Sequence, residues 1–144
     1  DVDAKFKEIA SFINLEKFKI GYCHNDLILN NILEVNTDLY LIDHEYSGPN
    51  YILYEIANMF NEININYNDY SLRNLDLNSL EKKVLYQYYG DKIKINNILK
   101  YLQKFKKISN FLWTLWSFKQ IDYNKNEFDY YRYGLLRFKM FTIN

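Results

Sequence analysis

The carboxylates of Asp26 and Asp43 and the amide of Asn31 lie before and after a short segment of apolar runs separated by turn residues. Asp26 lies five positions before Asn31, and Asp43 directly follows the apolar run 39–42. A carboxylate can accept a proton from a hydroxyl group, and carboxylate and amide oxygens suit Mg²⁺. A transferring phosphoryl group needs alignment and charge neutralisation, so these residues fit phosphoryl transfer. If the strand continued past Asp43, Glu45 would point to the same side and could bind a second magnesium ion.

The spacing of Asp26 and Asn31, just ahead of a predicted strand, is that of the protein-kinase catalytic loop. There the aspartate orients and deprotonates the hydroxyl, and the asparagine binds magnesium. A lone match of this kind arises easily by chance in a chain so rich in asparagine. Asp43 makes the match more specific, because it stands where the kinase layout has the aspartate that holds magnesium against the nucleotide phosphates.

The elements that must position these residues follow from apolar spacing. Apolar runs at 32–35 and 39–42, separated by Asn36, Thr37 and Asp38, predict a β-hairpin. Spacings of three and four predict helices over residues 3–18, 51–62, 78–89, 96–119 and 127–141, with Asn78 or Ser79 as a cap and 63–77 as a loop. In the long helix the stripe expected to be buried comprises Ile98, Tyr101, Leu102, Phe105, Ile108, Leu112 and Leu115.

Composition bounds the class of protein. The 144 residues are 49% hydrophobic, enough for one domain or one lobe of a larger fold. Eighteen basic and eighteen acidic residues cancel, which argues against nucleic acid or an anionic membrane as a partner. A single cysteine, no apolar run near the roughly 18 residues of a membrane span and no secretory signal favour a cytoplasmic protein.

Longer motifs connect these residues to a family. The chain contains CHNDLILNNIL from Cys23 and IDHEYSGPNYILYEIANMFNE from Ile42, followed by SNFLWTLWSFKQ and EFDYYRYGLLRF. In this order the segments resemble the choline and ethanolamine kinases over about residues 20 to 140. This chain departs from the usual family sequence at three positions. Asn30 stands in place of the usual glycine, His44 in place of an aromatic residue and Glu55 in place of aspartate.

The resemblance implies a role for each matching residue. Asp26 would be the catalytic base, and Asn31 and Asp43 would bind Mg²⁺, with Asp43 also holding ATP through the metal. Glu45 would contribute to the metal site. The expected reaction is ATP-dependent phosphorylation of choline, or alternatively of ethanolamine, for phospholipid head-group synthesis.

The resemblance also implies an aromatic pocket for the substrate ammonium group. Aromatic faces bind a quaternary ammonium, which has no hydrogen to donate, and a carboxylate assists. Without the resemblance, Trp113 and Trp116 would be read as ordinary helix core. Tyr67 favours choline, because the ethanolamine-selective branch tends to lack an aromatic there. The matching residues are Glu62, Tyr67, Trp113, Trp116, Phe128 and Tyr133.

The expected fold is α+β and mainly helical, a protein-kinase-like C-terminal lobe over residues 1–144 whose small β-hairpin carries the metal site. No glycine-rich loop, strand lysine or helix glutamate precedes Cys23, so the nucleotide lobe is expected outside these residues and the chain alone is expected to bind ATP poorly. A non-catalytic module that binds an ammonium ligand or a partner, and another small-molecule kinase, stay open as alternatives. The parent enzyme could be a homodimer.

Overall fold

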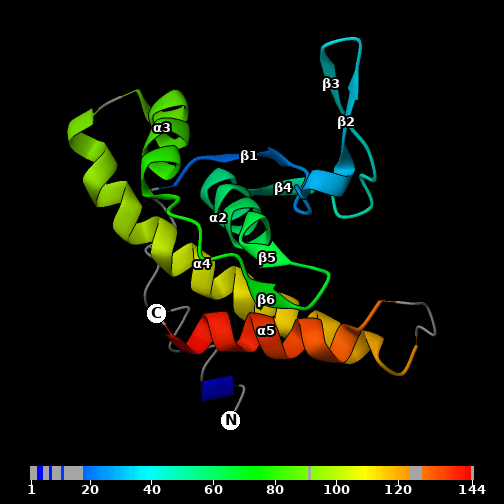
Figure 1. The fold of residues 1–144 in the computed structure, drawn as a ribbon. Helices are drawn as coiled ribbons and strands as arrows, with labels where there is room; N and C mark the ends of the chain where they lie inside the picture. The colour runs from blue at the N-terminus through cyan, green and yellow to red at the C-terminus, as the bar shows by residue number, and fades with distance from the viewer. Residues whose placement is uncertain are drawn as a thin grey trace.

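The computed structural model describes residues 18–90, 92–123 and 128–143, with Asp3, Ala4, Lys7 and Ser11, and of 92–94 only the backbone. The helix expected over residues 3–18 therefore lies almost entirely outside the described residues. The described elements, shown in Figure 1, are β1 (Ile20–Cys23), the 3₁₀ turn η2 (Leu29–Asn31), β2 (Ile32–Val35), β3 (Asp38–Leu41), β4 (Gly48–Tyr51), α2 (Ile52–Ile63), β5 (Ile65–Asn66), β6 (Ser71–Leu72), α3 (Asn78–Tyr89), α4 (Lys92–Gln120) and α5 (Tyr130–Ile143).

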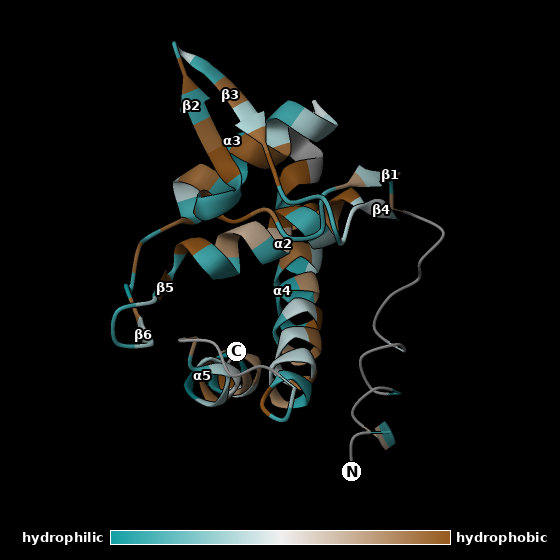
Figure 2. Cartoon of the chain, turned by 90° about the vertical axis from the view of Figure 1, so that its right-hand side faces the viewer, coloured by the Kyte–Doolittle hydropathy of each residue, from teal (hydrophilic) through white to brown (hydrophobic). Residues whose placement is uncertain are grey.

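The predicted hairpin is confirmed as β2 and β3, which pair antiparallel from Ile32 opposite Leu41 to Val35 opposite Asp38. Asn36 and Thr37 form its turn with φ of 51° and 82°, the left-handed backbone that suits a two-residue hairpin turn. The hairpin projects away from the helices in Figure 1, and in Figure 2 its tip extends beyond them. At its base the Ile42 amide donates to the Asn31 carbonyl at 3.0 Å, which draws the two flanks of the hairpin together.

Helices α2, α3 and α4 form the main apolar core. Each fully buried Leu, Ile or Phe stabilises the fold by about 1.5–3 kcal/mol. The spacing of three and four on α2 places one face against the other two helices, as the sequence predicts. The buried cluster comprises Leu53, Ile56, Ala57 and Phe60 of α2 with Leu85, Leu102 and Phe105.

The ends of α3 differ in how well the sequence predicts them. The Asn78 amide, at the first residue of the helix, donates to Asp76 Oδ1 at 3.2 Å, and the cap position itself is Leu77. The prediction of Asn78 or Ser79 as the cap was therefore wrong by one or two residues. Gly90 ends the helix with φ of 68°, and its amide donates to the Tyr86 carbonyl at 2.9 Å.

The buried face of α4 is not the predicted apolar stripe along its whole length. Leu112 and Leu115 are each 38% exposed, so the prediction is wrong for the C-terminal half of the helix. There the buried side chains are Phe111 and four small polar residues, Ser109, Asn110, Thr114 and Ser117. Small residues let α5 approach closely: a Cβ on Gly134 would lie 3.0 Å from Ser117 Oγ and from the Phe118 ring.

The segment 63–77, predicted as a loop, contains the short antiparallel pair β5 and β6. Ile65 is fully buried and anchors the first strand. Between the strands, Asp69 Oδ1 accepts hydrogen bonds from the Ser71 amide at 3.0 Å and the Ser71 hydroxyl at 2.7 Å. These local bonds between side chain and backbone turn the chain without an apolar pattern, which is why spacing missed them.

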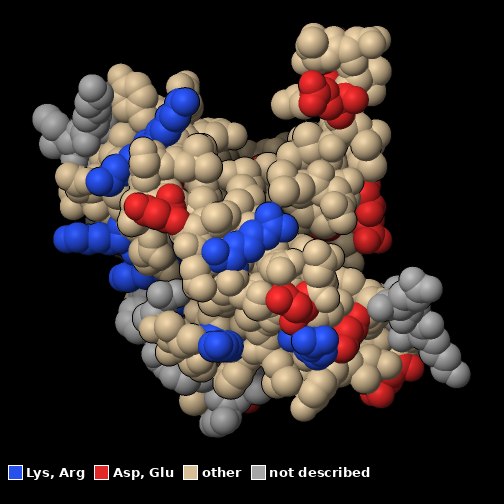
Figure 3. Space-filling model, in the orientation of Figure 1, with Lys and Arg blue, Asp and Glu red and all other residues tan. Residues whose placement is uncertain are grey.

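Charged side chains of both signs are interspersed on the face shown in Figure 3, in keeping with the zero net charge. Over the part of the chain that the structure describes, no helix is long and apolar enough to cross a membrane.

Candidate active site

The segment that carries Asp26 is held from two sides. β1 pairs antiparallel with β4, so the chain enters the loop beside the start of α2. Asn25 has φ of 66°, a left-handed backbone that asparagine tolerates better than most residues. Its amide donates to Glu55 Oε2 in the first turn of α2 at 2.9 Å, and its side chain contacts Asn50 and the Tyr46 carbonyl at 2.7 and 2.8 Å. The longer Glu55, in place of the family's usual aspartate, thus still reaches the loop.

Asp26 and Asn31 are in direct contact. The Asn31 amide group donates to the Asp26 carbonyl at 2.9 Å and to Asp26 Oδ2 at 3.1 Å. Burial and then the negative charge of Glu62 raise the pKa of Asp26 to about 6, while the Asn31 bond opposes the shift. At neutral pH the carboxylate is therefore mostly ionised yet basic enough to accept a proton.

Asp43 and Glu45 lie beyond the end of β3. Asp43 has φ of 61°, and its negative charge also raises the pKa of Asp26. Residues 42–44 are not part of a strand, and 45 and 46 form a turn. The strand therefore does not continue to Glu45, and the geometric argument that placed it beside Asp43 is wrong.

The donor set around the hairpin base is chemically suited to a hard cation. The Asn31 amide nitrogen is occupied by Asp26, so its amide oxygen is the atom left for a cation, and Asp43 supplies carboxylate oxygens. Among the described residues no group of three or more His, Cys, Asp or Glu side chains could by itself hold a metal ion. Two such oxygen donors fit Mg²⁺ bound jointly with substrate phosphates and water, which is how that ion usually binds.

A pocket of about 560 Å³ opens beside Asp26 and gathers residues from across the chain. It brings together Asp26 and all six residues assigned to the ammonium pocket from the sequence. Its lining comprises Asp26, Ile28, Asn30, Glu62, Tyr67, Tyr70, Trp113, Trp116, Phe128, Tyr130 and Tyr133. The proposed base and the aromatic cage therefore share one cavity.

Glu62 forms a buried hydrogen-bond network beneath the rings. It accepts from the hydroxyls of Tyr67 and Tyr133, the latter at 2.7 Å, and pairs with the guanidinium of Arg137. Arg137 is fully buried and also donates to Asn58 and Ser109, at 3.1 and 2.7 Å. Burial raises the pKa of both tyrosines, so they stay neutral donors.

The two tryptophans form one wall of the pocket and are half-buried, so they are not ordinary core residues. Their ring centroids lie 4.9 Å apart at 70°. Trp116 Nε1 donates to the Tyr46 hydroxyl at 3.2 Å, and the Tyr46 ring contacts Trp113 edge-on at 5.9 Å. This contact joins the cage to the segment that follows Asp43.

Sequence reasoning missed three functional neighbours of the cage: Tyr70, Tyr130 and Arg137. Arg137 follows Tyr133 by four residues, so it lies on the same helix face, and the buried carboxylate of Glu62 requires a counter-ion. The four-residue spacing and the need for a counter-ion could have identified Arg137 from the sequence. Tyr70 and Tyr130 had no signal in a chain with 15 tyrosines.

Comparison with known proteins assigns the chain to a family. The sequence model described as choline/ethanolamine kinase matches residues 1–142. The chain belongs to the choline/ethanolamine kinase family. The family assignment made from the four motifs is thereby confirmed.

Members of the family are similar to the chain in sequence and in structure. Mouse ethanolamine kinase 1 is 36% identical over 132 residues, covering 83% of this chain and 36% of that protein. A probable choline kinase of Arabidopsis thaliana is 33% identical, covering 87% of this chain and 40% of that protein. A solved Plasmodium vivax ethanolamine kinase superposes with a TM-score of 0.83 at 31% identity, over 99% of this chain and 39% of its own.

The mainly helical fold with small sheets is that of ethanolamine and choline kinase structures, so the predicted fold class is confirmed at that level. The chain spans less than half of the length of these relatives, at 36% and 40% of the two proteins named.

Proposed function

We propose that this chain carries the amine-binding and phosphoryl-transfer residues of an ATP- and Mg²⁺-dependent kinase that phosphorylates the hydroxyl of a small amino alcohol. The observation that carries this proposal is that Asp26 and the aromatic cage line one pocket. A molecule with a cationic head in the cage would have its hydroxyl a few atoms away, within reach of Asp26.

Asp26 acts as the base in this proposal. Its carboxylate accepts the hydroxyl proton while the substrate oxygen bonds to the γ-phosphorus of ATP and the bond from that phosphorus to the ADP oxygen breaks. Asn31 and Asp43, with Glu45 as a contributor on the family resemblance, would hold magnesium, which neutralises phosphate charge. Asn31 also fixes the base, because its amide group binds both the side chain and the backbone of Asp26.

Choline is the substrate that the cage chemistry favours. Glu62 already accepts hydrogen bonds from Tyr67, Tyr133 and Arg137, which use most of its lone pairs and offset its charge. A primary ammonium needs several acceptors, whereas a trimethylammonium needs apolar and aromatic faces, each worth about 0.5–2 kcal/mol. Seven of the eleven lining residues are aromatic, so the pocket suits the methylated cation.

Ethanolamine is the second candidate, because a relative named ethanolamine kinase matches at 36% identity. Its ammonium group would have to donate to Asp26, to the remaining lone pair of Glu62 and to tyrosine hydroxyl oxygens.

The test is ADP release with ATP and Mg²⁺ against choline and ethanolamine, in the complete protein that contains these 144 residues. We expect rapid turnover that falls at least about 1,000-fold in Asp26→Ala, because general base and substrate alignment are lost together. Asp38→Asn, at the hairpin turn, removes an equal charge and should keep the wild-type rate.

A protein that binds choline by calorimetry but phosphorylates neither amine would be a non-catalytic ammonium-binding module, contrary to the proposal.

A further inference from the structure

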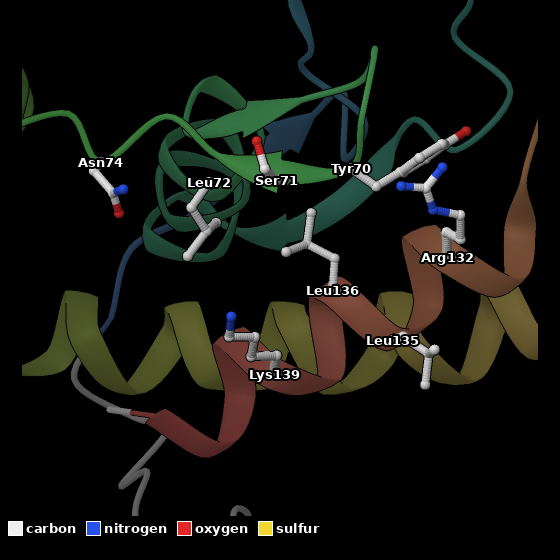
Figure 4. Close-up of a pocket in the computed structure, with 8 residues that line it drawn as sticks. All are labelled: Tyr70, Ser71, Leu72, Asn74, Arg132, Leu135, Leu136 and Lys139. Atoms are coloured by element: carbon white, nitrogen blue, oxygen red, sulfur yellow. The ribbon is translucent and has the colours of Figure 1, made fainter.

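Tyr70 separates two hollows of the molecule. On its outer side a groove of about 510 Å³ runs between the segment 70–74 and α5 (Figure 4). Tyr70 lines this groove together with Arg132 and Lys139, and it also lines the amine pocket. A side chain that borders both cavities is the wall between them. The position of this one ring therefore decides whether the cage is closed on that side.

Inside the amine pocket, the Tyr70 ring packs against two other rings of the cage. Its centroid lies 6.4 Å from that of Tyr67 and 5.9 Å from that of Phe128, both in edge-to-face geometry. Both partners line the same pocket. Tyr70 thus extends the set of aromatic faces that a cation in the pocket would meet.

A latch formed by Asp129, directly before α5, and Arg132 of α5 holds the ring from outside. The Tyr70 hydroxyl accepts a hydrogen bond from the Asp129 amide at 3.0 Å. The guanidinium of Arg132 lies 5.3 Å from the ring centroid and donates to the Asp69 carbonyl at 2.7 Å, and Figure 4 shows it reaching from the helix to the tyrosine. Tyr70 itself has φ of 54°, a conformation that costs a non-glycine residue energy and so must be held by its surroundings.

We propose that Tyr70 is a specificity-determining wall of the amine pocket and that Arg132 is the positioning residue that keeps this wall closed. The proposal rests on the proposed function, because the ligand is the ammonium head of the same substrate. The ring supplies one more aromatic face to a methylated cation, and opening of the latch would let water into the cage. Tyr70 therefore contributes more to choline than to ethanolamine.

The test is calorimetric titration of choline and of ethanolamine into the complete protein and its variants. We expect Tyr70→Ala to raise the choline dissociation constant about three- to thirty-fold, the equivalent of one cation–π contact, and the ethanolamine constant less. Tyr70→Phe keeps the ring and should restore most of the affinity. Arg132→Ala should raise the choline constant in the same direction by about two- to five-fold.

Lys139→Ala is the matched control for Arg132→Ala, since Lys139 lines the outer groove but not the amine pocket. Choline constants equal to wild type in Tyr70→Ala and Arg132→Ala would overturn the proposal, and so would an equal loss for both amines that Tyr70→Phe does not reverse. A wild-type protein that binds neither amine would instead refute the proposed function. If Tyr70→Ala does not fold, the choline dissociation constants of Tyr70→Phe and Arg132→Ala, compared with wild type, test the proposal.

Discussion

At the scale of single residues, the site combines charges that each have a structural cost. Asp26 is partly buried near two other carboxylates, and the fold holds its pKa at about 6. Glu62 is buried with a full counter-ion in Arg137. Burial of an ion pair seldom adds net stability, so its retention is better explained by the pocket that it supports.

Asp26→Asn should therefore stabilise the fold while it abolishes phosphoryl transfer. The folded state raises the Asp26 pKa from about 3.8 to about 6, so the stability of the fold falls as pH rises from about 3.8 to about 6, and the full cost of ionisation is present above that range. Below about pH 3.8 both states are protonated and the cost vanishes. The isosteric amide removes this cost, and after allowance for solvent screening of this partly exposed carboxylate we expect a gain of about 1–2 kcal/mol at pH 7.5 and little gain near pH 4.

Denaturant unfolding in EDTA at the two pH values measures this difference. Asp38→Asn, which removes one charge at the exposed hairpin turn, is the control and should show no such pH dependence. A loss of stability in Asp26→Asn at pH 7.5 would contradict the assigned environment of Asp26.

At the scale of elements, the contact between α4 and α5 positions the cage. The tryptophans come from α4, and Tyr130 and Tyr133 come from α5, so the distance between the helices sets the width of the pocket. Small polar residues on α4 and Gly134 on α5 allow the close approach. The Ser117 hydroxyl also donates to the Tyr130 carbonyl, at the start of α5.

Gly134→Val should separate these helices. The new side chain would meet Ser117 and the Phe118 ring at 3.0 Å, so we expect a loss of about 1–3 kcal/mol in the free energy of unfolding. Choline affinity should fall with it, because the two walls of the cage move apart. Gly48→Val is the matched control, since a Cβ there meets nothing within 4 Å. Urea unfolding measures the free energy of unfolding of both variants, and calorimetry measures their choline affinity. If both quantities were unchanged in Gly134→Val, the close packing of α4 and α5 would be refuted.

At the scale of the whole molecule, the amine pocket is formed entirely by described residues, whereas no other described element packs over most of the hairpin. The hairpin contains hydrophobic residues (Figure 2), and apolar side chains along it stay exposed, including Leu39 at 69% and Val35 at 50%. Patches of this kind commonly mark surfaces that contact something else. The base of the hairpin also brings together the flanks that carry Asn31 and Asp43.

We therefore expect residues 1–144 alone to bind choline but to turn over ATP little or not at all. No glycine-rich phosphate loop of the G-x-G-x-x-G type is present in these residues, and one face of the proposed nucleotide site would be open to water. Calorimetry with choline and ADP release with ATP, Mg²⁺ and choline, on the same preparation, would measure both. Robust turnover by the 144 residues alone would contradict this prediction.

What the sequence by itself determined is local. The spacing of Asp26 and Asn31, the hairpin and four helices follow from patterns within continuous segments, and the six residues predicted for the cage come from family motifs that are likewise continuous. The helix spacing failed in the C-terminal half of α4, where the burial of Ser109 and Ser117 depends on close packing against a second helix and not on hydrophobicity.

Only the tertiary structure decided which distant residues meet. Arg137 pairs with Glu62 across 75 residues of sequence, and Tyr70 meets Asp129 across 59. Such contacts depend on how α5 lies along α4 and on the short β5–β6 turn, and no periodicity within either segment reports them. The counter-ion of the pocket and its outer wall are consequences of packing, because buried charge and a left-handed tyrosine persist only where several elements hold them together.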